Sequence, residues 1–267
     1  MFFIFIVVTM RLFFRSRFRV PAVLSEKGGL RCRRGFTLIE MALMLVVAGT
    51  LMLGAVAAIR SQSKKTLLEK NHQAMREIEG ALLGFMAVEG HLPCPDWFDP
   101  VTNRADGAED RDLTVNDNGP CINSLDGQQL GLLPWRTLGI SPMDKWGNFY
   151  TYRVSSAYTV AGNHTLSSNG DMTFYSENGV ALVNGIPVMV VSHGPNGFGA
   201  YRMSLDAKVK VPFVNATLRE KENIINDGGD NTDNANPERF YQGGDDVLMW
   251  IPLDVIKLQA VESNWLP

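Results

Sequence analysis

The chain has 267 residues, of which 45% are hydrophobic and 20% charged, and its formal net charge is −3. This size and composition allow a substantial hydrophobic core and argue against a disordered or fibrous protein. Residues 1–35 hold eight Lys or Arg residues and one acid, so the remainder carries a formal charge of about −10. Phosphate binding depends on clustered positive charge, and we therefore expect no nucleic acid among the partners.

An apolar run of 24 residues, 36–59, follows this basic segment, and Glu40 is its only ionisable side chain. A helix of this length extends about 36 Å, which is enough to cross a bilayer. Arg33 and Arg34 immediately precede the run, so the positive-inside rule places residues 1–35 in the cytoplasm and the rest of the chain outside it. We therefore predict a transmembrane helix at 36–59.

A sequence motif marks the start of the run: Arg33-Arg34-Gly35-Phe36-Thr37-Leu38-Ile39-Glu40-Met41. An ordinary secretory signal fits poorly, because its cleavage site would follow the apolar run instead of preceding it. The motif resembles the prepilin motif shared by type IV pilins and type II secretion pseudopilins. The resemblance implies that prepilin peptidase cleaves between Gly35 and Phe36 on the cytoplasmic side, and that Phe36 is then N-methylated. Because the leader is longer than usual in this family, translation could start at either Met1 or Met10.

Glu40 is the candidate assembly residue. A carboxylate within an apolar span costs about 2.5 to 3.5 kcal/mol on insertion scales, so such a residue calls for a functional partner. By resemblance, this partner is the amino terminus of Phe36 in a neighbouring subunit, and the pair would set the register between subunits. The alternative is that Glu40 extends towards lipid headgroups without a role in assembly.

The helical pattern continues beyond the apolar run. Apolar residues recur at spacings of three and four from Leu68 to Phe85, among charged residues, which predicts an amphipathic continuation of the same helix. Gly90 and Pro93 supply its end. The predicted fold class is α+β and pilin-like, with a long N-terminal helix, transmembrane in its first half, packed on an antiparallel β-sheet. The predicted domains are a basic leader at 1–35, the transmembrane helix at 36–59, its amphipathic continuation at 60–90 and an extracytoplasmic globular β-rich domain at 91–267.

Strand and turn signals fill the second half of the chain. Asp144–Tyr152 resembles the Asp-x-Trp-Gly-Asn-x-Tyr element of major pseudopilins, which enters the first strand of their sheet. Strand patterns follow at 171–176, 180–183 and 186–192, with turn signals at Asn178-Gly179 and Asn184-Gly185, and predict an antiparallel meander. Thr217 and Glu220 predict a capping box for a short helix ending near Gly228, and Val247–Ile251 restores a strand pattern.

Two of the three cysteines, Cys94 and Cys121, lie beyond the predicted cleavage site, whereas Cys32 precedes it. In an oxidising compartment this pair would form a disulfide worth about 3 to 4 kcal/mol by the loop-entropy estimate. The alternative is two buried thiols. Two cysteines without paired histidines nearby fall short of a zinc site.

We expect no enzymatic activity. Ser192 precedes His193, but adjacency in sequence does not establish a catalytic triad, and no nucleophile-elbow motif occurs. Calcium is the one cofactor that we consider, because hard cations need several oxygen ligands. Asn196, Asp245 and Asp246 lie in pieces that resemble the calcium loop of major pseudopilins. The alternative is a solvated acidic loop.

The resemblance implies a structural subunit, of minor type by its size, of a type IV pilus or a type II secretion pseudopilus. Its implied partners are prepilin peptidase, other pilin or pseudopilin subunits and the inner-membrane assembly platform. It implies a single-pass protein of the bacterial inner membrane with its globular domain extracytoplasmic, which later enters a periplasmic pseudopilus or an extracellular pilus. The alternative is a binding module displayed on the filament, either an adhesin or a receptor for secretion substrates.

Overall fold

The computed structural model of the protein describes residues 37–97, 105–112, 114, 119–122, 130–204, 207–212, 215–224 and 238–266. At residues 53–61, 203–204, 207–209 and 218 it describes the backbone alone. The chain divides into two compact units, Met1–Ala57 and Ala58–Pro267, which we describe separately. The predicted cleavage site, Gly35 and Phe36, lies outside the described residues.

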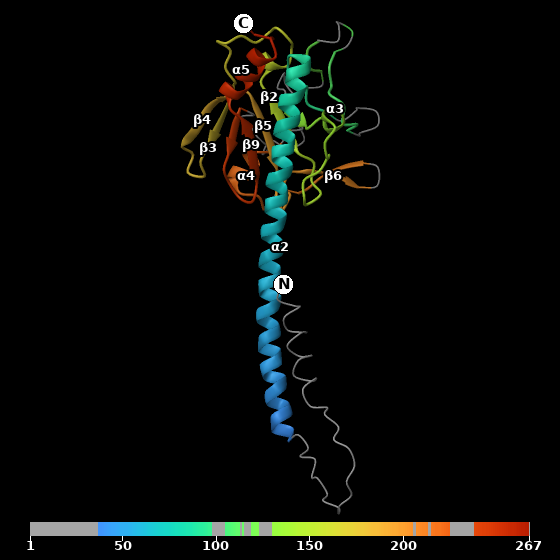
Figure 1. The fold of residues 1–267 in the computed structure, drawn as a ribbon, viewed down its shortest axis with the longest axis vertical. Helices are drawn as coiled ribbons and strands as arrows, with labels where there is room; N and C mark the ends of the chain where they lie inside the picture. Colours follow the sequence, from blue (N-terminus) through green and yellow to red (C-terminus); the bar gives the residue numbers. More distant parts are fainter. Residues whose placement is uncertain are drawn as a thin grey trace, which may run out of the picture. The chain divides into compact units, whose positions relative to one another are not determined.

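Figure 1 labels the helices and strands where there is room. In chain order they are α2 (Leu38–Glu89), β1 (Leu130–Leu132), α3 (Trp135–Leu138), β2 (Thr151–Val154), the short 3-10 helix η2 (Ser156–Tyr158), β3 (Met172–Tyr175), β4 (Ala181–Ile186), β5 (Val188–Ser192), β6 (Tyr201–Ser204), β7 (Ala207–Lys210), α4 (Leu218–Glu222), β8 (Arg239–Tyr241), β9 (Val247–Ile251) and α5 (Leu253–Glu262).

The ends of α2 have clear local causes. At its start, Thr37 and Glu40 form a reciprocal cap, in which the Thr37 N–H donates to Glu40 Oε2 (3.0 Å) and the Glu40 N–H donates to Thr37 Oγ1 (3.3 Å). At its other end, Gly90 adopts a left-handed conformation with φ 74°. A Cβ atom at Gly90 would lie 2.4 Å from the indole ring of Trp265, so this position requires glycine for two reasons.

The predicted fold class is wrong. The described chain contains both helices and strands, but none of its helices is long and apolar enough to cross a membrane. In addition, the division between the two units falls within α2, so a single long helix that is transmembrane first and packed second is not supported.

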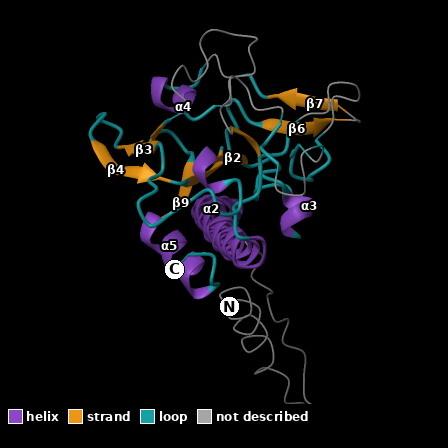
Figure 2. Cartoon of the chain, turned by 90° about the horizontal axis from the view of Figure 1, so that it is seen from above, coloured by secondary structure: helices purple, strands orange, loops and turns teal. Residues whose placement is uncertain are grey.

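A four-stranded antiparallel sheet, in the order β1-β2-β5-β9, organises the unit Ala58–Pro267. Figure 2 shows α2 and α5 side by side next to this sheet. Side chains alternate along each strand, so one face packs against the two helices. The fully buried side chains of that core include Leu82, Met86, Tyr152, Val190 and Ile256.

The opposite face of the four-stranded sheet packs against a three-stranded sheet in the order β4-β3-β8. The core between them is formed largely by Met172, Phe174, Ile186, Met189, Val191 and Phe240. β3 pairs with β4 in antiparallel and with β8 in parallel register, so the second sheet is mixed and not wholly antiparallel.

The predicted meander is corrected by this topology. Asn178-Gly179 does form the turn between β3 and β4, with Gly179 at φ 80°. Asn184-Gly185, however, lies inside β4, where the pairing with β3 is irregular. Pro187 then separates β4 from β5, which pairs with β2 and β9 in the other sheet. A proline cannot donate a ladder hydrogen bond, which fits a point where the chain leaves one sheet for the other.

Candidate functional site

An acidic cluster lies where α4 meets the loop before β9. Thr217 and Glu220 cap α4 through the predicted capping box, although the helix ends at Glu222 instead of near Gly228. The cap holds Glu220 in place, because its Oε2 accepts from the Thr217 N–H (2.6 Å). Glu220, Asp245 and Asp246 each contribute one carboxylate oxygen, and these three oxygens lie within 4.8 Å of one another. We call these three residues the acidic cluster.

Asn196 approaches the cluster with its amide nitrogen. The Nδ2 atom donates to Glu220 Oε1 (2.9 Å) and to Asp245 Oδ1. Its Oδ1 atom accepts from the Phe198 N–H (2.8 Å), and the Asn196 N–H donates to Asp245 Oδ2 (2.9 Å). In this arrangement the side-chain amide of Asn196 offers the carboxylates a donor, in the role that a cation would otherwise fill.

The electrostatics of the cluster are those of crowded negative charge. Burial raises the pKa of Asp246 well above its ordinary value, and the neighbouring carboxylates of Glu220 and Asp245 raise it further. Burial likewise raises the pKa of Asp245. At Glu220, burial opposes ionisation, but hydrogen bonds from Thr217 and Asn196 outweigh it and lower the pKa. A cation bound among these groups would favour their ionised forms.

Three carboxylates suit a hard cation such as calcium, which binds oxygen ligands, typically six to eight in number. They supply part of such a shell, and main-chain oxygens or water would have to complete it. Sequence analysis placed Asn196, Asp245 and Asp246 in this site, and the structure brings all three together. It missed Glu220, because the capping box already gave that residue a local role.

His193 lies directly behind the cluster and is fully buried. Its Nε2 is 2.8 Å from Thr151 Oγ1, and its Nδ1 is 3.7 Å from Asp246 Oδ1. This order of hydroxyl, imidazole and carboxylate resembles a catalytic triad, but Thr151 is itself buried, which keeps its hydroxyl away from any substrate. Burial lowers the pKa of His193 to about 4, so the ring is neutral at physiological pH.

Ser192 points to the other face of β5 and belongs to a separate buried network. Its hydroxyl donates to Asp144 Oδ2 (2.8 Å) and accepts from Asn71 Nδ2 of α2 (3.2 Å). Asp144 also accepts from the Asn148 N–H and from Asn148 Nδ2, which in turn donates to the Gly194 carbonyl (2.8 Å). The network therefore links α2 to the loop that carries Asn196. The Asp144–Tyr152 element leads into β2, the second of the described strands and not the first.

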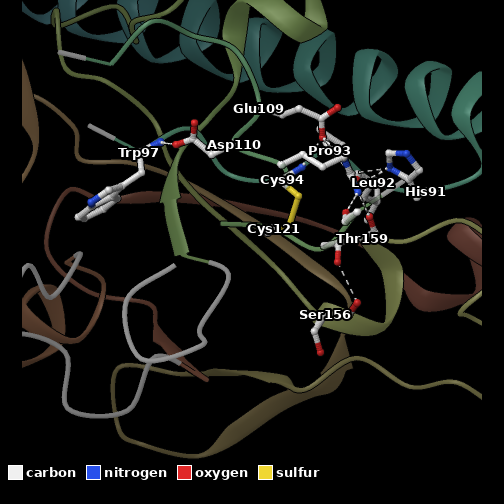
Figure 3. Close-up of a disulfide and its surroundings, with 12 residues drawn as sticks. His91, Leu92, Pro93, Cys94, Trp97, Glu109, Asp110, Cys121, Ser156 and Thr159 are labelled. Carbon is white, nitrogen blue, oxygen red and sulfur yellow. Dashed lines mark hydrogen bonds and ion pairs between the residues drawn. A yellow bond between two sulfur atoms is a disulfide. The ribbon is translucent and has the colours of Figure 1, made fainter. Parts of the chain in front are cut away.

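The disulfide predicted between Cys94 and Cys121 is confirmed. Figure 3 shows it beside Glu109 and His91. It closes a loop of 27 residues in sequence separation, which corresponds to about 3 to 4 kcal/mol of loop entropy. The Cys94 N–H donates to Glu109 Oε2 (2.9 Å), and the same carboxylate forms a salt bridge with the buried Arg111.

Arg111 braces the loop around the disulfide. Its Nη1 donates to the carbonyls of Gly119 (2.6 Å) and Thr159 (2.7 Å), and its Nη2 contacts His91 Nδ1 (3.1 Å). Burial lowers the pKa of His91, and the charge of Arg111 lowers it further. The two contacts of Nδ1 require opposite tautomers: the Arg111 guanidinium needs Nδ1 to accept, whereas the Leu92 carbonyl, 3.0 Å from the same atom, needs it to donate.

Asp96 is a buried acid that sequence analysis did not single out. It is fully buried, and its Oδ2 accepts from the Gly107 N–H (3.0 Å), whereas its Oδ1 has no hydrogen-bond partner in the part of the chain that the structure describes. Burial, with added repulsion from Asp110 and Asp106, raises the pKa of Asp96 to about 8. The carboxyl group is therefore mostly protonated at neutral pH.

Calcium should stabilise the protein through the acidic cluster. Excess calcium should raise the melting temperature, since a ligand at 100 times its Kd adds about 2.7 kcal/mol to stability. Asp245→Asn should abolish most of this shift, whereas Asp254→Asn, an exposed acid on α5, should preserve it. Differential scanning calorimetry with and without calcium measures the shift. Equal shifts in both variants, or no shift in the unaltered protein, would contradict this site.

Asp96 should make stability depend on pH. Because its pKa rises from 3.8 in the unfolded chain to about 8 in the fold, its contribution is complete below pH 3.8 and is lost as the pH rises through 8. Asp96→Asn should flatten the fall in the free energy of unfolding over this window, by at most about 1.4 kcal/mol per pH unit. Urea unfolding across the window measures it, with Asp254→Asn as the control. A profile unchanged by Asp96→Asn would refute the assignment.

The remaining predicted residues have separate outcomes. Glu40 is described and caps α2 with Thr37, whereas Gly35 and Phe36 lie outside the described residues.

Comparison with known proteins adds no further evidence: no protein-family model matches the chain, and neither a curated protein nor a solved structure matches it. A functional proposal for this chain therefore depends on its own residues.

Proposed function

We propose that the chain is a structural subunit, of the minor kind, of a type IV pilus or a type II secretion pseudopilus. The observation that carries the proposal is the motif Arg33-Arg34-Gly35-Phe36 with Glu40 five residues beyond the glycine. In this proposal, prepilin peptidase at the inner membrane removes residues 1–35 and the new amino-terminal residue, Phe36, is methylated. The subunit is then passed to the assembly platform and joins other pilin or pseudopilin subunits.

The exposed start of α2 supports a role in assembly. Between Leu38 and Met52 every described side chain is exposed, including Leu38 at 92% and Leu45 at 70%. Isolated exposed apolar residues are common in proteins, but a continuous helical segment of them indicates a surface that a partner covers. Helices of neighbouring subunits are the partners that the proposal assigns to this segment.

The Cys94–Cys121 disulfide supports a location outside the cytoplasm for the unit Ala58–Pro267. Disulfides persist in oxidising compartments, such as the bacterial periplasm and the cell exterior, and are rare in the reducing cytoplasm. This location agrees with a periplasmic pseudopilus or an extracellular pilus. A role outside catalysis is part of the same proposal, since the triad-like group at His193 is buried.

The proposal predicts that prepilin peptidase removes the leader in the host. Protein isolated from host membranes should begin at N-methylated Phe36 when prepilin peptidase is present, and should retain the leader when the peptidase gene is deleted. Amino-terminal sequencing and intact mass measure the difference. A retained leader in both strains would exclude this class of subunit.

Glu40 should act in assembly through its charge, beyond its capping of α2. Glu40→Gln keeps a side chain that can close the capping box with Thr37 but removes the charge, so it should impair incorporation into filaments. Thr37→Ala weakens the cap by about 1 kcal/mol and keeps the carboxylate, so it should assemble. Filaments sheared from cells and detected by immunoblot measure incorporation. Normal assembly of Glu40→Gln would leave Glu40 with a capping role alone.

A further inference from the structure

The outward face of the three-stranded sheet carries two tyrosines flanked by two arginines. Tyr175 of β3 and Tyr241 of β8 are paired in register, and their rings stack with centroids 4.9 Å apart. The Arg219 guanidinium lies over Tyr241, with Cζ 4.5 Å from the ring centroid, and the Arg239 guanidinium lies 6.0 Å from the centroid of Tyr175. We call these four residues the Arg–Tyr surface.

Strand alternation fixes the direction of this surface. Phe174 and Phe240, the neighbours of the two tyrosines in sequence, are buried in the core between the sheets. Because successive side chains point to opposite faces, Tyr175 and Tyr241 lie on the face turned away from that core. Arg239 is exposed, Tyr175 and Arg219 are half-buried, and Tyr241 is buried beneath the Arg219 guanidinium.

Arg219 reaches from α4 across to the turn between β3 and β4. Its Nε donates to the Glu177 carbonyl (3.2 Å), and its Nη2 lies 3.2 Å from the position of a Cβ at Gly179. Within the described ranges, no carboxylate pairs with Arg219 or with Arg239. Two arginines that pair with no described carboxylate stand out in a chain region whose formal charge is about −10.

The neighbouring strand β4 offers an open edge. β4 pairs with β3 on one side, and no described strand pairs with its other side, which lies at the margin of the fold in Figures 1 and 2. Val180 and Leu182 are 62% and 52% exposed there, and Ala181–Ile186 contains no charged residue. Natural proteins usually protect such an edge with charge, proline or a covering segment.

The open edge of β4 and the two arginines together indicate the chemistry of a partner. An open strand edge can hydrogen-bond the main chain of an extended segment, and arginine forms bidentate hydrogen bonds with carboxylates. We propose that β4 and the Arg–Tyr surface bind an extended acidic segment of a partner protein, which adds as a strand beside β4. Its apolar side chains contact Val180 and Leu182, and its carboxylates contact Arg219 at the turn.

The geometry ranks the two arginines. The Arg219 Nε donates to the Glu177 carbonyl in the turn that leads into β4, so Arg219 is placed to make the direct contact. The Arg239 guanidinium lies 6.0 Å from the Tyr175 ring on β3, one strand in from β4, and contributes a weaker, screened attraction. A nucleic acid fits less well, because its dense charge would be repelled by the acidic remainder of the chain. This inference concerns the globular unit and does not depend on filament assembly.

The test uses the full-length protein and a fluorescein-labelled peptide of alternating Glu and Val. Fluorescence anisotropy should show saturable binding that weakens with added salt. Arg219→Gln should weaken it about tenfold, Arg239→Gln by a smaller factor, and Arg136→Gln, an exposed arginine on α3, should leave it unchanged. A peptide of the same sequence with N-methylated main-chain amides should not bind, because it cannot add as a strand.

Amide hydrogen exchange locates the contact, and bound peptide should protect Ala181–Asn184. Equal binding of the N-methylated peptide or of an alternating Lys and Val peptide would overturn the proposal, as would tighter binding of oligothymidylate or protection confined to other strands. No saturable binding up to about 1 mM peptide would also overturn it. If Arg219→Gln unfolds, as circular dichroism would reveal, Arg239→Gln and the N-methylated peptide still decide the outcome.

Discussion

The Asp144 carboxylate is the interaction on which the rest of the globular unit depends. It accepts hydrogen bonds from the turn before β2 and from Ser192 on β5, and Ser192 in turn contacts Asn71 on α2. A buried carboxylate is costly unless such donors surround it, so these elements can pack closely only in this arrangement. Through Asn148 the same network holds the Gly194 carbonyl, and with it the loop beside the acidic cluster.

Local signals in the sequence predicted the elements whose causes are local. The apolar spacing of three and four placed the packing face of α2, Asn178-Gly179 placed a turn, and Thr217 with Glu220 placed a cap. The predicted fold class was wrong, because no described helix is long and apolar enough to cross a membrane. The pairing partners of the strands were not predicted. β1 and β8 are three residues long, and the parallel pairing of β8 with β3 joins segments more than 60 residues apart. Neither the short strands nor the distant pairing produces a hydrophobic pattern that a short sequence window can detect.

In the candidate site, too, some features could be predicted from the sequence and others could not. A resemblance in sequence placed Asn196, Asp245 and Asp246 together, and the structure agrees, but the orientation of the Asn196 amide depends on its contact with Phe198. Asp96 illustrates the limit further. Its raised pKa comes from burial and from acidic neighbours on a loop ten or more residues away, so no feature of its immediate sequence reveals it.

The position of Trp265 has a consequence for the order of folding. Its indole ring covers Gly90, its Nε1 donates to the Ala87 carbonyl (3.1 Å), and the next residue, Leu266, joins the core that α2 shares with the four-stranded sheet. Trp265 and Ala87 are 178 residues apart in sequence, so this part of the core closes through a long-range contact. It can therefore form only after the segment that carries Trp265 has been made and has returned to α2.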